Sequence, residues 1–147
     1  MIPSSFDLTA PEDWSAASPT PGTVALLVEP ERDGDPFRCA VSLIFEDVAG
    51  DDIDLARYTR TRIASLAGVL TDALVIDQQP TTLAGAEAIV STIGYRQGSD
   101  ALTLRQWSAI AGDTGVLLGA VCPNDRFPGL QPTLDEIAQS LALETQP

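Results

Sequence analysis

The sequence contains no histidine and no lysine, and these two absences exclude most familiar routes to catalysis. Histidine is the usual general base near neutral pH and the commonest metal ligand, so Ser–His–Asp triads, Cys–His pairs and His-containing zinc sites are ruled out. Lysine nucleophiles are ruled out as well. Only chemistry carried by carboxylates or by nucleophiles other than lysine remains, which is a narrow range. We therefore expect that the protein is not an enzyme and that it uses no cofactor and no metal.

Positive charge is scarce, because 21 acidic residues face 8 basic residues, all of them arginine, and the formal net charge is -13. Such a surplus of negative charge repels phosphate backbones and anionic lipid headgroups. The composition therefore predicts neither a nucleic-acid partner nor a membrane partner. We interpret the charge mainly as a source of solubility, with a cationic partner or a halotolerant host as alternatives. We expect the partner to be another protein or a second copy of the same chain.

Cysteine and long apolar runs are also scarce. Cys39 and Cys122 are too few for a disulfide framework, and we interpret them as buried, reduced thiols, with a disulfide between them as the alternative. No run approaches the roughly 18 apolar residues that a membrane-spanning helix needs. Residues 1–9 contain no basic stretch and no apolar stretch of signal-peptide length, so we expect a cytoplasmic protein.

What the chain does contain is enough apolar sequence for one packed domain. Hydrophobic residues make up 44% of its 147 residues, and no internal repeat, low-complexity tract or long linker divides it. We expect a single domain over residues 1–147.

The first part of the chain is predicted to form three strands and a helix. Residues 5–8 alternate, and residues 15–22 are expected to be a loop. The runs 23–29 and 37–46 flank a polar turn that contains Asp-Gly-Asp, which is typical of a hairpin. Apolar side chains then recur at helical spacing from Leu55 to Leu70.

The second part is predicted to form an antiparallel meander and a final helix. Four strand-like runs are joined by connections too short for parallel crossovers. These runs cover residues 73–79, 86–95, 101–110 and 115–121, with a turn over 80–85 after the first of them. Residues 123–132 are expected to be a loop, followed by a helix that begins with a capping box at Thr133 and Glu136. The tail beyond Leu143 is expected to fray.

Together these elements predict an α+β fold, in which two main helices pack on an antiparallel sheet of about six to seven strands. The predicted order of elements is β-β-β-α-β-β-β-β-α.

Two motifs have both a chemical and a structural interpretation. The acidic cluster Asp51, Asp52 and Asp54 could bind a hard cation, but it lacks the spacing of a calcium loop and matches the start of a helix better. The glycine-rich segment 112–119 resembles a phosphate-binding loop, but no helix follows it, so we favour a hairpin turn.

The meander carries apolar residues on both of its faces. Leu102 and Leu104 alternate with Thr103, Arg105 and Trp107, so neither face of the sheet is wholly polar. Either a helix of this chain, a second copy or a client segment must cover the second face.

Basic residues concentrate in one segment of the predicted first helix. Arg57, Arg60 and Arg62 form either a solvated, partly paired face or a docking patch for an acidic partner. The candidate partner-binding residues of the chain are therefore Thr103, Arg105, Trp107, Arg57 and Arg60.

The layout resembles the PsbP/DcrB-like group, which includes the LpqN-type lipoproteins. The positions that carry the resemblance are Phe6, Leu8, Pro11 and Trp14 at the start, Asp54 and Tyr58 in the helix, Leu83-Ala84-Gly85 before the meander, and Ile137 and Leu141 in the last helix. The resemblance implies a non-catalytic binding or assembly factor and supplies no catalytic residue. One branch resembles secretion chaperones, which shield apolar client segments against the sheet.

These observations lead to two functional hypotheses, besides a third one of an enzyme that uses carboxylates alone and would need a buried Asp or Glu pair facing a cleft. The first is a non-catalytic accessory protein that binds another protein, for instance as a chaperone or adaptor for a secreted or apolar client. The alternative is a small-molecule or lipid carrier with an apolar pocket on the sheet.

Overall fold

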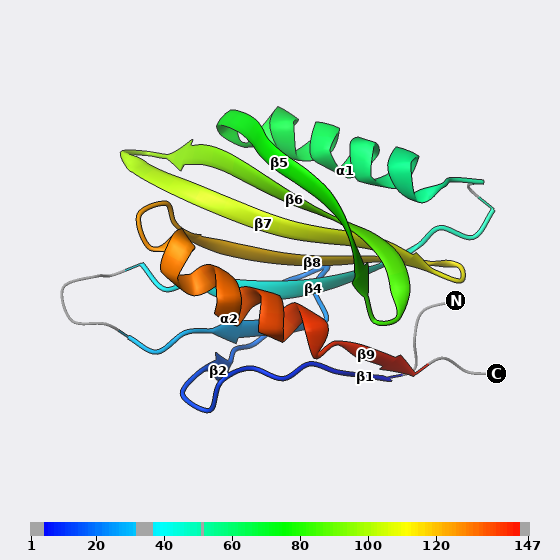
Figure 1. The fold of residues 1–147 in the computed structure, drawn as a ribbon, viewed down its shortest axis with the longest axis horizontal. Coiled ribbons are helices and arrows are strands. Elements are labelled where there is room, and N and C mark those ends of the chain that lie inside the picture. The colour runs from blue at the N-terminus through cyan, green and yellow to red at the C-terminus, as the bar shows by residue number, and fades with distance from the viewer. Residues whose placement is uncertain (1–4, 32–36, 51, 145–147) are drawn as a thin grey trace.

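A computed structural model describes residues 5–31, 37–50 and 52–144, and it consists of one large sheet with a helix on each face (Figure 1). The elements are β1 (Ser5–Asp7), β2 (Ser15–Ala16), β3 (Ala25–Val28), β4 (Ala40–Asp47), α1 (Leu55–Val69), β5 (Thr71–Leu83), β6 (Ala86–Gln97), β7 (Asp100–Ala111), β8 (Thr114–Pro123), α2 (Phe127–Gln139) and β9 (Ala142–Glu144). The predicted α+β class and the predicted order of elements are confirmed. Two short strands, β2 and β9, add to that order.

The large sheet has seven strands in the order β2-β3-β4-β8-β7-β6-β5, and each neighbouring pair is antiparallel. The hairpin of β3 with β4 and the meander from β5 to β8 are therefore confirmed. The glycine-rich segment forms the turn between β7 and β8, where Gly112 has a φ of 62° and Ile110 pairs with Gly115. The hairpin-turn interpretation of this segment is confirmed.

The two ends of the described chain form a separate two-stranded sheet. Phe6 of β1 pairs with Leu143 of β9, and Ser5 Oγ donates a hydrogen bond to Glu144 Oε2 at 2.7 Å. The expectation that the tail frays directly after Leu143 is therefore wrong for Glu144. This residue is held by backbone pairing, which the local sequence alone does not reveal.

The hydrophobic core lies between the sheet and α2, on the side seen in Figure 1. Its buried members come from β4 to β8, from the residue before β4, from α2 and from the segment after it. They are Cys39, Val41, Leu43, Leu83, Ala88, Val90, Trp107, Ala109, Val116, Leu118, Ala120, Cys122, Leu134, Ile137, Ala138 and Leu141. Because Leu134, Ile137 and Leu141 are all buried, the predicted apolar side of the final helix is confirmed.

The final helix nevertheless begins earlier than predicted. Two prolines, Pro128 and Pro132, suggested a loop, yet α2 starts at Phe127. Proline is tolerated in the first turn because its missing N–H would have no partner within the helix there. Thr133 is therefore not an N-cap. The tertiary contact of the helix with the sheet outweighs the penalty of Pro132 inside it.

The strand β5 is longer than predicted, because it runs through Pro80 to Leu83. Pro80 pairs with Ile89 and is tolerated because β5 is the edge strand of the sheet, where a missing N–H can face solvent. The turn is confined to Ala84 and Gly85, both with positive φ. The prediction of a turn over 80–85 is therefore wrong, as is that of a loop throughout 15–22, since β2 lies there.

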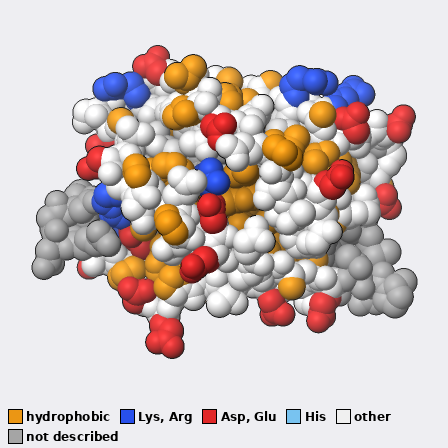
Figure 2. Space-filling model, viewed as in Figure 1, with side chains coloured by type: hydrophobic (Ala, Val, Ile, Leu, Met, Phe, Trp, Pro, Cys, Tyr) orange, Lys and Arg blue, Asp and Glu red, His pale blue; other side chains and the backbone are white. Residues whose placement is uncertain are grey.

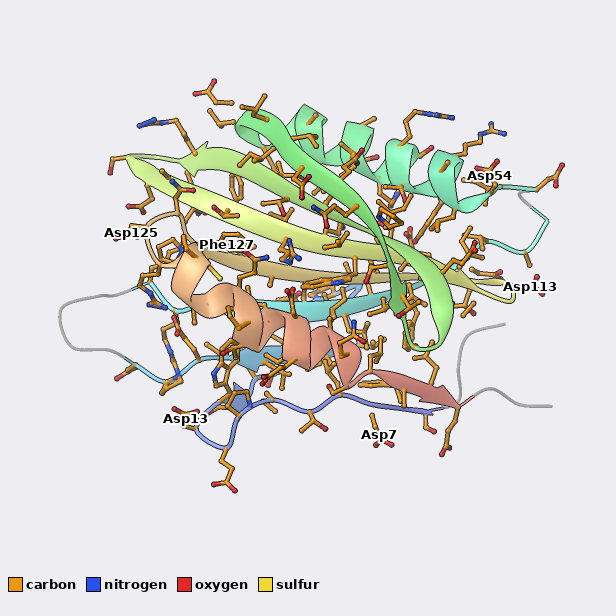
Figure 3. All side chains as sticks on the ribbon, in the orientation of Figure 1. Asp7, Asp13, Asp54, Asp113, Asp125 and Phe127 are labelled. Atoms are coloured by element: carbon orange, nitrogen blue, oxygen red, sulfur yellow. The ribbon has the colours of Figure 1, made fainter. Side chains whose placement is uncertain are left out.

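Asp54 of the acidic cluster is the N-cap of α1 (Figure 3). Its carboxylate accepts a hydrogen bond from the Arg57 N–H at 2.8 Å. The helix-capping interpretation is confirmed for this residue. Asp51 and the predicted Asp-Gly-Asp turn at 33–35 lie outside the described residues.

Both cysteines are buried and free, as predicted, and they lie close together. Ala40 pairs with Val121 in the ladder of β4 with β8, so Cys39 lies opposite Cys122 at the end of that ladder. The neighbouring Cys122 side chain and burial both raise the pKa of the Cys39 thiol. The two cysteines therefore act as packed apolar residues in this state.

Candidate docking groove

Three of the five predicted partner-binding residues lie beneath α2. Trp107 is 2% exposed and Thr103 is also buried. The Arg105 Nε donates to Asp135 Oδ1 of α2 at 2.9 Å, and the Arg105 guanidinium lies 5.3 Å from the centre of the Trp107 ring. The chain itself thus covers the face that these residues share, and neither Thr103 nor Trp107 offers exposed surface to a partner.

The other two predicted residues, Arg57 and Arg60, lie on α1 and are exposed. They stand on the opposite side of the sheet from Trp107, so the five candidates do not form one site. Neither guanidinium has an ion pair or hydrogen bond to another described residue. Arg62, by contrast, pairs with Glu46 at 3.1 Å. Arg57 and Arg60 are therefore available to an external partner.

The face of the sheet beneath α1 mixes buried polar side chains with buried apolar ones such as Ile93, Leu104 and Leu117, which share it by strand alternation. Ser91 and Gln106 lie side by side in the ladder of β6 with β7, and Gln78 Nε2 of β5 donates to Ser91 Oγ at 3.1 Å. Strand alternation places Ser108 on this same face. Only Tyr58 and Thr59 of α1 are buried. The helix α1 is thus held by fewer apolar contacts than α2.

Several polar groups in this interface lack partners within the described part of the chain. The buried atoms without a hydrogen bond there are Thr59 Oγ1 and Arg62 Nε of α1 and Gln106 Oε1 and Ser108 Oγ of β7. Each buried polar group left unsatisfied costs about 1–3 kcal/mol. Native proteins contain few such groups, so their concentration between one helix and the sheet marks this interface as a place where a bound group could supply the missing hydrogen bonds.

A hydrogen-bonded cluster fixes the N-terminal half of α1 to the sheet. Tyr58 Oη donates to Glu46 Oε1 at 2.6 Å, and Arg62 donates to the other oxygen of the same carboxylate. The Tyr58 ring packs directly on Gly115, where no side chain intervenes. Burial and the hydrogen bond to Glu46 raise the pKa of Tyr58 above its ordinary value. This anchor sets the position of α1 above the sheet.

A groove opens beside this anchor, between α1 and the edge of the sheet. It encloses about 380 Å³. One stripe of α1, at the spacing i, i+3, i+4 and i+7, forms one wall, and β5 and β6 form the other. Its lining residues are Ala56, Thr59, Arg60, Ile63, Val75, Gln78 and Ile89. Arg60 is the only charged residue among them, so the groove is mainly apolar with one positive charge at its helix wall.

Exposed apolar side chains continue from the groove along the edge strand. Leu74, Val75 and Ile76 are consecutive in β5 and are 67%, 41% and 59% exposed, and Val69 at the end of α1 is also exposed. Register shifts in β5 occur on both sides of Val75, which explains why three neighbouring side chains all reach solvent. The Ile76 side chain packs over Gly94, and a Cβ atom at position 94 would lie 3.3 Å from Ile76 Cδ1.

The groove was only partly predictable. Arg60 was identified from its charge, but Thr59, Ile63, Val75 and Ile89 were not identified as site residues. The three consecutive apolar residues 74–76 were the available indication, because a half-buried strand alternates more strictly. In Figure 2, which shows the side covered by α2, basic side chains gather mostly at the upper corners and the left of the view, and acidic side chains are spread over this face and its outline.

The groove offers binding contacts, and its lining includes neither a carboxylate nor a thiol. In residues 5–31, 37–50 and 52–144, no three Cys, Asp or Glu side chains are grouped so that they could hold a metal ion. Over the same ranges, neither α1 nor α2 is long and apolar enough to span a membrane.

Known proteins resemble the chain in fold but not in sequence. No protein-family model matches it, and no curated protein sequence matches it. The crystal structure of LpqN, a Mycobacterium tuberculosis protein involved in cell envelope biogenesis, matches with a TM-score of 0.79 over 95% of this chain and 83% of LpqN, at 18% identity. A Pseudomonas aeruginosa protein of unknown function matches with a TM-score of 0.68 over 91% of this chain and 98% of that one, at 12% identity.

The cyanobacterial PsbP of Synechocystis matches in the same way, with a TM-score of 0.68 over 94% of this chain and 86% of PsbP, at 14% identity. The chain therefore has a PsbP-like fold, as the motif positions predicted. At these identities the likeness extends to the fold alone.

Proposed function

We propose that the protein is a non-catalytic accessory factor that binds a segment of another protein in the groove between α1 and β5. The observation that carries this proposal is the apolar groove itself, which continues into the exposed side chains of Leu74, Val75 and Ile76. Soluble proteins rarely leave contiguous apolar surface uncovered, and such surface beside a concave site commonly binds a partner.

The position of the groove supports a protein partner in particular. The groove runs beside β5, whose outer edge pairs with no other described strand. An extended segment lying there can place side chains in the groove while its backbone approaches the edge. Pro80 limits continuous pairing to part of the strand, so we expect side-chain contacts to carry most of the affinity.

Site-specific cross-linking tests this function. A photo-reactive amino acid at Val75 is expected to capture a discrete protein partner in the native host. The matched control is Val24, which is 38% exposed and lies beside β3 near the other end of the sheet. The captured protein should be identified by mass spectrometry and then purified for direct binding measurements.

Aspartate substitutions complete the test. Val75→Asp should weaken binding of the purified partner at least about tenfold, which corresponds to about 1.4 kcal/mol, whereas Val24→Asp should leave it unchanged. Both valines are exposed, so neither substitution should unfold the protein. Equal capture at both positions, or equal binding by both variants, would reject the groove as the docking site.

A second candidate function is a small-molecule or lipid carrier, because a cavity of about 380 Å³ lies within the range of ligand pockets. Native mass spectrometry of the purified protein distinguishes the two functions. A small molecule retained by the parent protein and absent from Val75→Asp would favour the carrier, whereas a protein cross-link at Val75 favours the accessory factor.

A further inference from the structure

We infer that the partner segment is acidic, with a large apolar side chain that enters the groove next to a carboxylate held by Arg60. This inference rests on the proposed function and specifies the chemistry of the partner. It is carried by two independent features of α1, which are the unpaired arginines at the groove and the buried hydroxyl of Thr59.

The charge of the groove is opposite to that of the molecule. The chain carries a net charge of -13, yet the only charged residue of the lining is Arg60. Within the described residues, Arg57, Arg60 and Arg96 have guanidinium groups without an ion pair or hydrogen bond. Two of these three stand one helical turn apart on α1. A carboxylate that enters the groove therefore meets unneutralised positive charge, with which it can form charge-assisted hydrogen bonds.

The hydroxyl of Thr59 supplies a polar contact within the same groove. Thr59 lines the groove and is only 3% exposed, and its Oγ1 makes no hydrogen bond to another described residue. A buried hydroxyl in this state gains free energy from any donor or acceptor that reaches it. Thr59 and Arg60 are adjacent in sequence, so one bound segment can contact both.

The remaining lining determines what else the segment must bring. Ile63, Val75 and Ile89 present aliphatic surface, and a leucine, isoleucine or phenylalanine side chain would bury that surface together with its own. Burial of such an anchor contributes affinity, while Arg60 selects the neighbouring charge. A purely acidic segment lacks the anchor, and a basic segment lacks the carboxylate.

Two short synthetic peptides test this inference directly. The first alternates leucine with glutamate, and the second alternates leucine with lysine. We expect the glutamate peptide to shift the backbone amide signals of α1 and β5 in the nuclear magnetic resonance spectrum. The lysine peptide is drawn to the acidic surface in general, so it should cause small shifts that are not concentrated at the groove.

Charge reversal supplies matched variants. Arg60→Glu should weaken binding of the glutamate peptide at least about tenfold, equivalent to about 1.4 kcal/mol. Arg96→Glu makes the same change of charge at another unpaired arginine outside the lining, and it should weaken binding only slightly. Thr59→Val should weaken binding without altering the preference for glutamate, because it replaces the hydroxyl by a methyl group and leaves the charge of the groove unchanged.

Failure of this inference can be distinguished from failure of the proposed function. Absence of shifts in α1 and β5 with the glutamate peptide overturns the inference, as does equal binding by Arg60→Glu and Arg96→Glu. If Val75 still cross-links to a protein in that case, the accessory function stands and only the acidic chemistry is wrong. If Val75 captures nothing and no peptide binds, both fail.

Discussion

At the scale of single residues, the contact between Tyr58 and Gly115 leads to a sharp prediction. A methyl group at Gly115 would lie 2.6 Å from Tyr58 Cζ, so the ring must move and the anchor of α1 is disturbed. We expect Gly115→Ala to lower the free energy of unfolding by about 1–3 kcal/mol, as overpacking commonly does. Chemical denaturation measures the change.

Gly68 provides the matched control for this substitution. It lies inside α1, and a methyl group there meets no atom within 4 Å. Gly68→Ala should therefore stabilise the protein by about 0.5–1 kcal/mol, because alanine has the higher helix propensity. If both alanines changed stability in the same direction, steric contact with Tyr58 would not explain the effect at Gly115.

The same tyrosine predicts a loss of stability at high pH. Burial and the hydrogen bond to Glu46 raise the pKa of Tyr58 above the ordinary value of 10.0. As the pH rises past that value, the unfolded chain releases the phenolic proton while the folded chain retains it. Stability is therefore unaffected below pH 10.0 and falls above it, by up to about 1.4 kcal/mol per pH unit for this group.

The variant Tyr58→Phe tests this prediction through the slope of stability against pH rather than through the stability at one pH. Removal of the hydroxyl lowers stability at neutral pH, but it should also flatten the decline above pH 10.0. Burial raises the pKa of Tyr95 as well, so part of the decline should persist in the variant. Parallel declines in both proteins would show that Tyr58 is not the group responsible.

At the scale of secondary structure elements, the N-cap of α1 should contribute both to the stability of the protein and to peptide binding in the groove. Asp54 is the N-cap, and its carboxylate accepts the Arg57 N–H. Asp54→Ala should lower the free energy of unfolding by about 1 kcal/mol, whereas Asp54→Asn keeps an acceptor and should cost less. Because Arg57 and Arg60 lie in the first turns, peptide binding should weaken in parallel. If the Asp54 variants changed stability and peptide binding independently, the cap would not contribute to binding in the groove.

The elements also show which parts of the fold the sequence determines. Alternation, short glycine-containing connections and helical spacing predicted the meander, the hairpin and α1, because these signals are local. The start of α2 and the length of β5 were missed, since Pro128, Pro132 and Pro80 depend on where the chain places them. Pro128 is tolerated in a first helical turn and Pro80 on a sheet edge, whereas Pro132 stands inside α2, where packing on the sheet outweighs its penalty. None of these positions is visible from local sequence.

The candidate site depends even more on tertiary arrangement. The pattern of β7 identified Trp107 and Arg105 as residues of a second apolar face, but it did not reveal that α2 covers them. The groove combines a stripe of α1 with single residues of β5 and β6. Sequence reasoning identified Arg60 because basic residues concentrate in that segment of an otherwise acidic chain. It missed Val75 because the consequence of a register shift appears only when the strands pair.

At the scale of the whole molecule, charge should act in opposite directions on folding and on binding. The net charge of -13 makes the folded chain repel itself, and salt screens that repulsion, with a Debye length of about 10 Å at 0.1 M. Added sodium chloride should therefore raise the midpoint of thermal unfolding. The same salt should weaken binding of the glutamate peptide, because its carboxylates are attracted locally to Arg57 and Arg60.

Measurement of both quantities across one salt series distinguishes a specific groove from general electrostatics. If the peptide were held only by apolar contact, salt would leave its affinity unchanged or strengthen it. If the net charge governed the encounter, salt would strengthen binding of the acidic peptide. Only attraction by the arginines of α1 predicts weaker binding in the same buffers that stabilise the fold. Arg60→Glu should reduce that salt dependence, since only Arg57 then remains, while leaving the thermal trend in place.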